Sequence, residues 1–265
     1  MYDYHMHTSF SADSTASMEE MIESAIKKGF KEIAITDHID YDYPDLQIDF
    51  SLDFENYHNA LEKNAQKYKN QIRVVKGLEM GIQKHILNEC MAAANEYPYD
   101  FIIASVHAAE KKDLDTGAYF ENKSPYQSYI DYYTYVYDCL KEFKDYSVTG
   151  HLSLIDRYKK YISEPVAYNV YSDIVEEIFK LIINDGKGIE LNASCYRYNT
   201  EELMPSIEML KLYKELSGEI ITVGSDAHSP EYIGYKFDYI YDLLSNIGFK
   251  YIATFNNMKV DFVKL

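Results

Sequence analysis

The stretch YDYHMHTSFSADSTASMEEMIESAIKKGFKEIAITDH, residues 2–38, decides the fold of this chain. It opens with an alternating run at 2–7 that is typical of a strand. A helical pattern follows, beginning with Ser17 and Glu20 in capping-box spacing, and Gly29 stands where a helix C-cap belongs. A second β-branched run, KEIAIT, comes next. The stretch therefore predicts a strand-helix-strand unit, which is the building block of parallel sheets.

The same alternation of short β-branched runs and longer helical patterns continues along the chain. The predicted strands are 2–7, 31–36, 72–79, 100–106, 146–150, 187–192 and 219–226. Before the fifth strand, one helical face is predicted to carry Tyr126, Tyr129, Ile130, Tyr133, Tyr137, Leu140 and Phe143. A final hairpin is expected to turn at Asn256 and Asn257. Because no repeat or linker interrupts the 265 residues, we expect one α/β domain over 1–265.

Composition narrows the class of partner. A formal charge of −17 argues against a nucleic-acid backbone or an anionic membrane surface as the main partner. Cys90, Cys139 and Cys195 have no C-x-x-C spacing, so we expect reduced packing residues. The sequence has neither an apolar run long enough for a membrane span nor a signal peptide at its start, and we expect a soluble, cytoplasmic protein.

Histidines and acids gather where the predicted strands end. The residues at these positions are His5, His7, His38, Glu79, His107, His151, Asp226 and His228. A single H-x-H pair also occurs as ordinary hydrogen-bonded residues, but a whole set at one edge, interleaved with carboxylates, favours a site built from several strands. The other two histidines, His58 and His85, are expected to be surface or packing residues.

This donor set is typical of divalent transition metals. Imidazole suits zinc, iron, manganese or nickel, and carboxylates add hard oxygen ligands that can bridge two ions. The number of donors exceeds what one ion can use. We therefore expect two or three metal ions, with Glu79 as the shared carboxylate.

The motifs HMHTSFSAD, ITDH, GLEMG, SVH, TGH and GSDAH resemble those of the PHP (polymerase and histidinol phosphatase) superfamily. The match runs from His5 to His228 and is nearest to the monofunctional histidinol-phosphate phosphatases. The resemblance implies a distorted seven-stranded β/α barrel with a metal cluster at the C-terminal edge of the strands, and that fold agrees with the strand count.

The resemblance also implies how the ligands divide among three metal ions. The first group comprises His5, His7, Glu79 and Asp226; the second comprises Glu79, His107 and His151; the third comprises His38 and His228. Some relatives carry a further histidine where this chain has Asp13. We infer that Asp13 completes the third group as an oxygen ligand, the alternative being a cap of a helix or turn.

Two arginines fall near the expected site. Arg157 and Arg197 match positions at which the histidinol phosphatases carry phosphate-contacting arginines, and guanidinium binds phosphate oxygens in a bidentate manner that lysine cannot copy. Arg73, at the start of the third predicted strand, is expected to be structural.

The resemblance implies hydrolysis of L-histidinol phosphate, a step of histidine biosynthesis, with metals that lower the pKa of water to about 7. We count Glu79, Asp226 and His228 as catalytic, Asp226 being one candidate to assist the leaving alkoxide. The loop after the second predicted strand carries six acids that could attract a cationic substrate, the alternative being a solvated acidic loop: Asp40, Asp42, Asp45, Asp49, Asp53 and Glu55.

Three alternatives stay open. A PHP phosphoesterase could act on nucleotides or other small phosphate esters, and a non-catalytic metal-binding PHP module would keep the fold without the reaction. A metal-dependent amidohydrolase also begins with H-x-H, but its bridging lysine is expected near the fourth strand's end, where this chain has His107.

Overall fold

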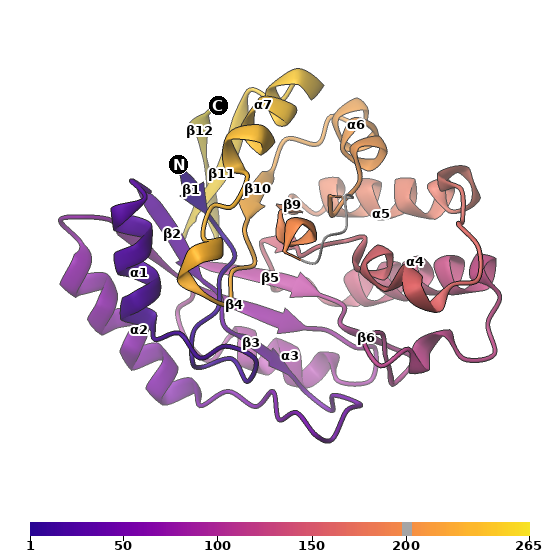
Figure 1. The fold of residues 1–265 in the computed structure, drawn as a ribbon, viewed down its shortest axis with the longest axis horizontal. Helices are drawn as coiled ribbons and strands as arrows, with labels where there is room; N and C mark the ends of the chain where they lie inside the picture. Colours follow the sequence, from indigo (N-terminus) through magenta and orange to yellow (C-terminus); the bar gives the residue numbers. More distant parts are fainter. Residues whose placement is uncertain (198–202) are drawn as a thin grey trace.

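The computed structural model describes residues 1–197 and 203–265. Its central sheet follows the order β1 (Tyr2–Asp3), β2 (Glu32–Ile35), β4 (Arg73–Gly81), β5 (Phe101–Ser105), β8 (Val148–Thr149), β9 (Gly188–Asn192) and β10 (Ile221–Gly224). Neighbouring strands on this path pair in parallel. The predicted strand set is therefore confirmed, with seven parallel strands in a near-closed barrel (Figure 1).

The barrel closes because the first predicted strand, 2–7, lies between β2 and β10. On one side, β1 pairs with β2, and the Thr36 amide beyond β2 donates to the Met6 carbonyl at 2.9 Å. On the other side, the Tyr4 amide donates to the Val223 carbonyl at 2.9 Å, and the Asp226 amide donates to the His5 carbonyl at 2.8 Å. The segment therefore joins the first and last strands of the path.

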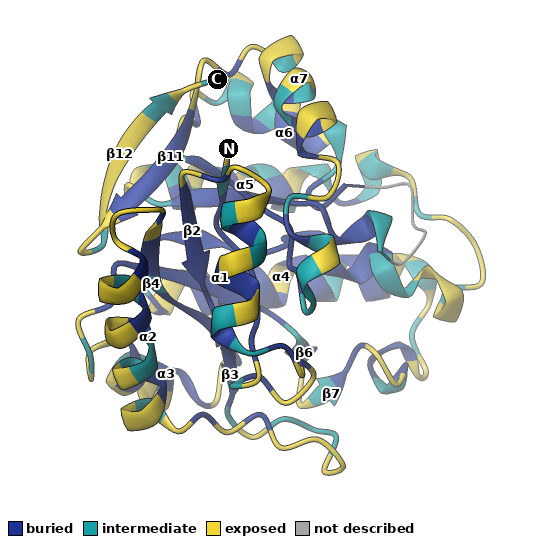
Figure 2. Ribbon diagram, turned by 60° about the vertical axis from the view of Figure 1, so that its left-hand side comes forward, coloured by how far each residue is buried: buried dark blue, intermediate teal, exposed yellow. Residues whose placement is uncertain are grey.

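Helices stand outside the strands (Figure 1). They are α1 (Met18–Lys27), α2 (Phe54–Tyr68), α3 (Leu87–Ala94), α4 (Pro125–Glu142), α5 (Ser172–Asn184), α6 (Ile207–Glu215) and α7 (Phe237–Ile247), with short 3-10 helices η1 (Ala118–Phe120), η2 (Leu154–Tyr161), η3 (Tyr168–Val170), η4 (Ser194–Tyr196) and η5 (Pro230–Tyr232). Figure 2 shows buried strands at the centre and exposed outer faces on the helices. In the part of the chain that is described, no helix is both long and apolar enough to cross a bilayer.

The start of α1 is built as the sequence predicts. The Glu20 amide donates to Ser17 Oγ at 3.2 Å, and the Ser17 amide donates to Glu20 Oε2 at 2.8 Å, which completes the capping box. Gly29 follows the helix with φ of 78°, a left-handed conformation that glycine adopts without strain.

The predicted face of α4 is only partly correct. Tyr126 is 56% exposed, whereas Tyr132 and Tyr135, which lie outside the predicted stripe, are buried. The Tyr135 hydroxyl accepts a hydrogen bond from the Lys84 amide, so α4 is covered on a side that a single periodic stripe does not include. A helix with neighbours on more than one side buries a wider face.

Five further strands of the described residues lie off the barrel path. These are β3 (His38–Asp40), which pairs with β4, the hairpin β6 (Ala108–Ala109) and β7 (Lys112–Asp113), and the hairpin β11 (Tyr251–Asn256) and β12 (Lys259–Lys264). The last hairpin is present as predicted, but its turn lies one residue later than expected: Asn256 still pairs with Lys259, and Asn257 and Met258 form the turn with φ of 48° and 60°. The sequence did not predict β3.

A small apolar cluster fills the barrel at its amino end. It consists of Tyr4, Ala34, Val75, Phe101, Ile103 and Val148 from the barrel with Ala253 and Phe255 from β11. Side chains four residues apart on a strand share a face, so Val75 and Glu79 of β4 point to the same side. The hairpin thus closes the amino end, and the polar site occupies the carboxyl end.

The cysteines, Arg73, His58 and His85 have the packing, structural or surface roles that the sequence predicts. The three cysteines are free and buried. Arg73 pairs with Glu32 at 2.9 Å, His58 stacks on Tyr97, and His85 contacts Asp42 at 2.7 Å.

Candidate metal centre

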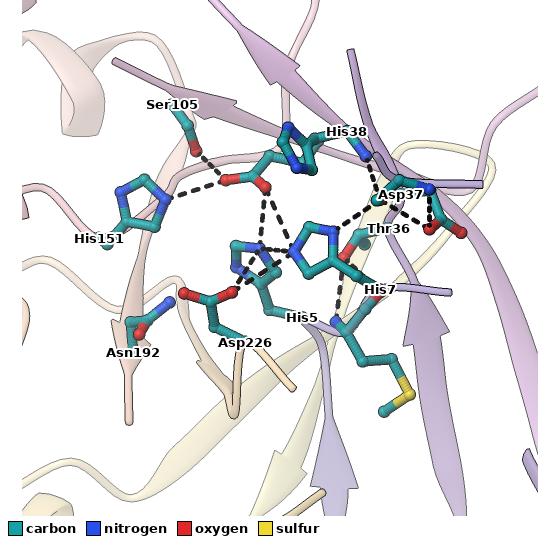
Figure 3. A network of polar contacts seen from close by, with 12 residues as sticks. His5, His7, Thr36, Asp37, His38, Ser105, His151, Asn192 and Asp226 are labelled. Atoms are coloured by element: carbon teal, nitrogen blue, oxygen red, sulfur yellow. Dashed lines mark hydrogen bonds and ion pairs between the residues drawn. The ribbon is translucent and has the colours of Figure 1, made fainter. Parts of the chain in front are cut away.

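All nine residues predicted as metal ligands lie together at the carboxyl end of the barrel. Eight of them line a cavity of about 430 Å³: His7, Asp13, His38, Glu79, His107, His151, Asp226 and His228. His5 lies beneath the cavity and has no exposed surface. Figure 3 shows His5 and His7 turned toward Asp226, which comes from a segment far away in the sequence.

Glu79 stands between two pairs of imidazoles. Its Oε2 is 3.1 Å from His5 Nε2 and 3.5 Å from His7 Nε2. Its Oε1 is 3.0 Å from His151 Nε2 and 3.3 Å from His107 Nε2. Each carboxylate oxygen therefore serves a different pair, which is the arrangement of a ligand shared by two ions.

The spacing of the nitrogens also fits bound cations. His5 Nε2 and His7 Nε2 face each other at 3.0 Å, and His107 Nε2 and His151 Nε2 do so at 3.3 Å. Two nitrogens that bind one tetrahedral zinc ion at about 2.0–2.1 Å lie about 3.3 Å apart. The donors present thus match divalent metal in both type and spacing.

A third group forms around Asp13. Its Oδ1 is 3.2 Å from His38 Nε2, and its Oδ2 is 3.0 Å from His228 Nε2. Ser17, not Asp13, caps α1. His7, His38 and His228 also have ring nitrogens close enough to share an ion.

The density of carboxylates changes the protonation of this cluster. Burial opposes the charged form of His5, but Glu190, Glu79 and Asp226 outweigh it and raise its pKa well above the ordinary 6.5. Burial likewise opposes protonation of His38, yet hydrogen bonds to Asp13 and Asp40 raise its pKa to about 10. Without metal, these imidazoles hold protons at neutral pH.

The pKa values of the two central carboxylates shift in the opposite direction to those of His5 and His38. Burial disfavours ionisation of Glu79 and Asp226, but the charge of His5 and the imidazoles around them lower both pKa values well below their usual range. His7 behaves differently, since burial and the nearby His228 lower its pKa to about 3. His7 is therefore a neutral donor at physiological pH.

The loop after β1 is held by a buried carboxylate that sequence reasoning missed. Asp37 accepts hydrogen bonds from the Thr8 amide at 2.6 Å and from the Ser11 hydroxyl at 2.7 Å. Ser11 Oγ in turn lies 3.0 Å from His7 Nδ1. This chain of bonds fixes the ring of His7 so that its Nε2 faces Glu79.

Glu190 is a second missed carboxylate. Its Oε1 is 2.6 Å from His5 Nδ1, and its Oε2 accepts from the His151 amide at 2.8 Å. A Cβ at Gly224 would lie 2.1 Å from Glu190 Oε1, so glycine leaves room for this carboxylate. The sequence did contain an indication of this buried carboxylate, because Glu190 is a charged residue inside the predicted strand KGIELN.

Both predicted phosphate-binding arginines line the same cavity. Arg157, on η2, donates to Ser194 Oγ at 2.7 Å and lies 3.3 Å from Asp226 Oδ2. Arg197, directly after η4, donates to His228 Nδ1 at 2.8 Å. Two guanidinium groups therefore stand beside Asp226, at the rim of the cluster.

The acidic loop does not act as a uniform patch. Asp40 is buried and contacts His38 and His107, so it belongs to the cluster rather than to a solvent-facing loop. Asp53 accepts from the Asn56 amide and caps α2. The carboxylates of these two residues are engaged within the protein, so neither belongs to a solvent-facing acidic loop that could attract a substrate.

The fold and the site together define a β/α barrel with clusters of metal-binding residues at the carboxyl ends of its strands. A model of the PHP domain matches residues 3–194, and the chain belongs to the PHP domain family.

Curated relatives match over nearly the whole chain. The histidinol-phosphatase of Lactococcus lactis is 30% identical over 98% of this chain and 96% of its own length. The histidinol-phosphatase of Bacillus subtilis is 26% identical over 89% of this chain and 96% of its own length. A crystal structure of the Lactococcus lactis histidinol phosphate phosphatase, complexed with zinc, L-histidinol and phosphate, superposes with a TM-score of 0.88 at 28% identity and covers 98% of each chain.

The raised pKa values of His5 and His38 predict that metal binding releases protons, because each imidazole must lose its proton to become a ligand. Apparent zinc affinity of chelator-stripped protein should therefore rise with pH between 6 and 9, by about tenfold per pH unit for each proton displaced. Calorimetric titration in two buffers of different ionisation enthalpy measures this release. Zinc binding with no net proton release across that range would contradict the protonation pattern.

Proposed function

We propose that this chain is a metal-dependent phosphatase that hydrolyses L-histidinol phosphate to L-histidinol and inorganic phosphate. The observation that carries the proposal is that two arginine side chains and a carboxylate facing two imidazole pairs line one cavity. The relatives named histidinol-phosphatase, and the one solved with zinc, L-histidinol and phosphate, support this substrate. A role in histidine biosynthesis follows from that reaction.

We assign three divalent ions, zinc, manganese or iron, to the donor groups. The first would be held by His5, His7, Glu79 and Asp226, the second by Glu79, His107 and His151, and the third by Asp13, His38 and His228. Bound ions supply Lewis acidity, which lowers the pKa of a water ligand to about 7 and offsets the charge of a phosphate monoester.

Arg157 and Arg197 bind the phosphoryl group in this proposal. Their guanidinium groups both lie near Asp226, at 3.3 Å for Arg157 and 3.9 Å for Arg197, and Arg197 also donates to His228. Planar guanidinium matches phosphate oxygens with two parallel hydrogen bonds, so each arginine can exchange its present partner for the substrate. Both also offset the charge that develops on the oxygens during the reaction.

We assign proton transfer to Asp226. Burial disfavours its charged form, but His5 and its other cationic neighbours lower its pKa, so the carboxylate is ionised before the reaction. When His5 serves as a neutral metal ligand, its charge no longer lowers this pKa, and the carboxylate becomes a stronger base. In this proposal it accepts a proton from the water whose oxygen bonds to phosphorus, and it returns that proton to the alkoxide oxygen as the ester bond to phosphorus breaks. His228 holds Arg197 and Asp13 in place beside it.

Phosphate release tests the reaction directly. Chelator-stripped protein reloaded separately with zinc, manganese or iron is expected to hydrolyse L-histidinol phosphate with a higher kcat/KM than a nucleoside monophosphate or p-nitrophenyl phosphate. Activity on the comparators alone would reject the substrate and keep the phosphoesterase. Full metal occupancy without any hydrolysis would reject the catalytic proposal and favour a binding module.

Replacing either arginine tests phosphate binding. Arg157→Lys and Arg197→Lys keep the charge but lose the planar pair of donors, so we expect kcat/KM to fall about 100-fold while metal content stays unchanged. The matched control is Arg73→Lys, since Arg73 pairs with Glu32 at the start of β4, away from the cavity. Wild-type kcat/KM in both site variants would remove the arginines from the mechanism.

A further inference from the structure

Asp40 touches two imidazoles that belong to different metal groups. Its Oδ2 is 2.9 Å from His38 Nδ1, and its Oδ1 is 2.8 Å from His107 Nδ1. The carboxylate is 3% exposed. A buried carboxylate with two such contacts is fully engaged inside the protein and is removed from direct contact with a substrate.

The two rings present their other nitrogens to the ligand groups. His38 Nε2 faces Asp13 at 3.2 Å, whereas His107 Nε2 faces Glu79 at 3.3 Å. A carboxylate only accepts hydrogen bonds, so it requires a proton on Nδ1 of both rings. With the proton on Nδ1, the Nε2 atom of a neutral ring carries the lone pair. This lone pair points to the third metal group in His38 and to the second metal group in His107.

The backbone is shaped to admit this carboxylate. Strand β3 pairs in parallel with β4 so that Asp40 lies opposite Gly81. A Cβ at position 81 would stand 1.9 Å from Asp40 Oδ1. Glycine at this position therefore leaves the space into which the Asp40 side chain turns, and β3 carries both Asp40 and His38.

We propose that Asp40 is a positioning residue that orients one ligand of the second metal group and one ligand of the third, and so couples the occupancy of the two groups. This inference rests on the metal-dependent function proposed above. Loss of one carboxylate disturbs two groups at once, whereas the first group, whose His5 is oriented by Glu190, keeps its own support.

The variant Asp40→Asn keeps the shape of the side chain but removes its charge and one of its two acceptor oxygens. An amide oxygen can accept from one Nδ1–H, but the amide nitrogen cannot accept from the other. One ring then loses the partner that fixes its tautomer, and the other ring keeps only a neutral acceptor, which is weaker than a carboxylate. Removing such a partner typically weakens metal affinity 10- to 100-fold, so we expect a loss of that size in one zinc-binding event and a smaller loss in a second.

The experiment compares chelator-stripped wild type, Asp40→Asn and the control Asp49→Asn, whose carboxylate is exposed in the same loop. Zinc stoichiometry is measured by elemental analysis and affinity by calorimetry, and circular dichroism of the metal-free proteins checks the fold. Weakening in Asp40→Asn alone, confined to two binding events, supports the proposal. Unchanged zinc binding in Asp40→Asn, or equal losses at every event, would overturn it.

A second measurement uses only the wild-type protein, so it does not depend on whether a variant folds. In zinc-loaded wild type with ¹⁵N-labelled histidine, His38 and His107 should both show a protonated Nδ1 and a metal-bound Nε2. An ion on the Nδ1 atoms, with Asp40 as its direct ligand, would also overturn the proposal. These readouts concern metal and tautomer alone, whereas phosphate release by wild type decides the proposed function separately.

Discussion

The structure depends on the burial of one carboxylate, that of Glu79, at the centre of the barrel mouth. The side chain is 2% exposed, and four imidazoles lie within 3.5 Å of its two oxygens. Burying an ionised carboxylate is costly unless cations and hydrogen bonds compensate it. The imidazolium charge of His5 and the Ser105 hydroxyl, 2.6 Å away, provide that compensation without metal.

The barrel makes this arrangement possible by separating its two ends. The hairpin of β11 and β12 supplies Ala253 and Phe255 to the apolar plug at the amino end. The carboxyl end is thereby left for polar groups, and two further carboxylates, Glu190 and Asp40, stand behind the imidazoles. Both need glycine opposite them, Gly224 and Gly81 respectively, because any side chain there would collide with the carboxylate.

Much of this site could be predicted from the sequence because parallel strands bring their carboxyl ends together. Histidines at strand ends, such as His107 and His151, were therefore expected to meet, and they do. Asp13 was grouped with His38 and His228 because some members of the resembling family carry a histidine at its position, and its carboxylate does lie between their rings. The metals assigned to these groups stay a prediction.

The remaining features depend on contacts that sequence spacing does not encode. The role of Asp40 requires β3, a three-residue strand, and a glycine 41 positions later. The segment that continues β1 bonds to the chain beyond β2 on one side and to β10 on the other, and no local pattern records this closure. The broad buried face of α4 likewise results from neighbours on more than one side.

The most direct test of a shared Glu79 is a crystal structure of the zinc-loaded protein with anomalous data at the zinc edge. We predict two ions on opposite oxygens of Glu79, about 3.5–4 Å apart, one beside His5 and His7 and the other beside His107 and His151. Zinc on only one side of Glu79 at full occupancy, or bound away from this carboxylate, would contradict the account.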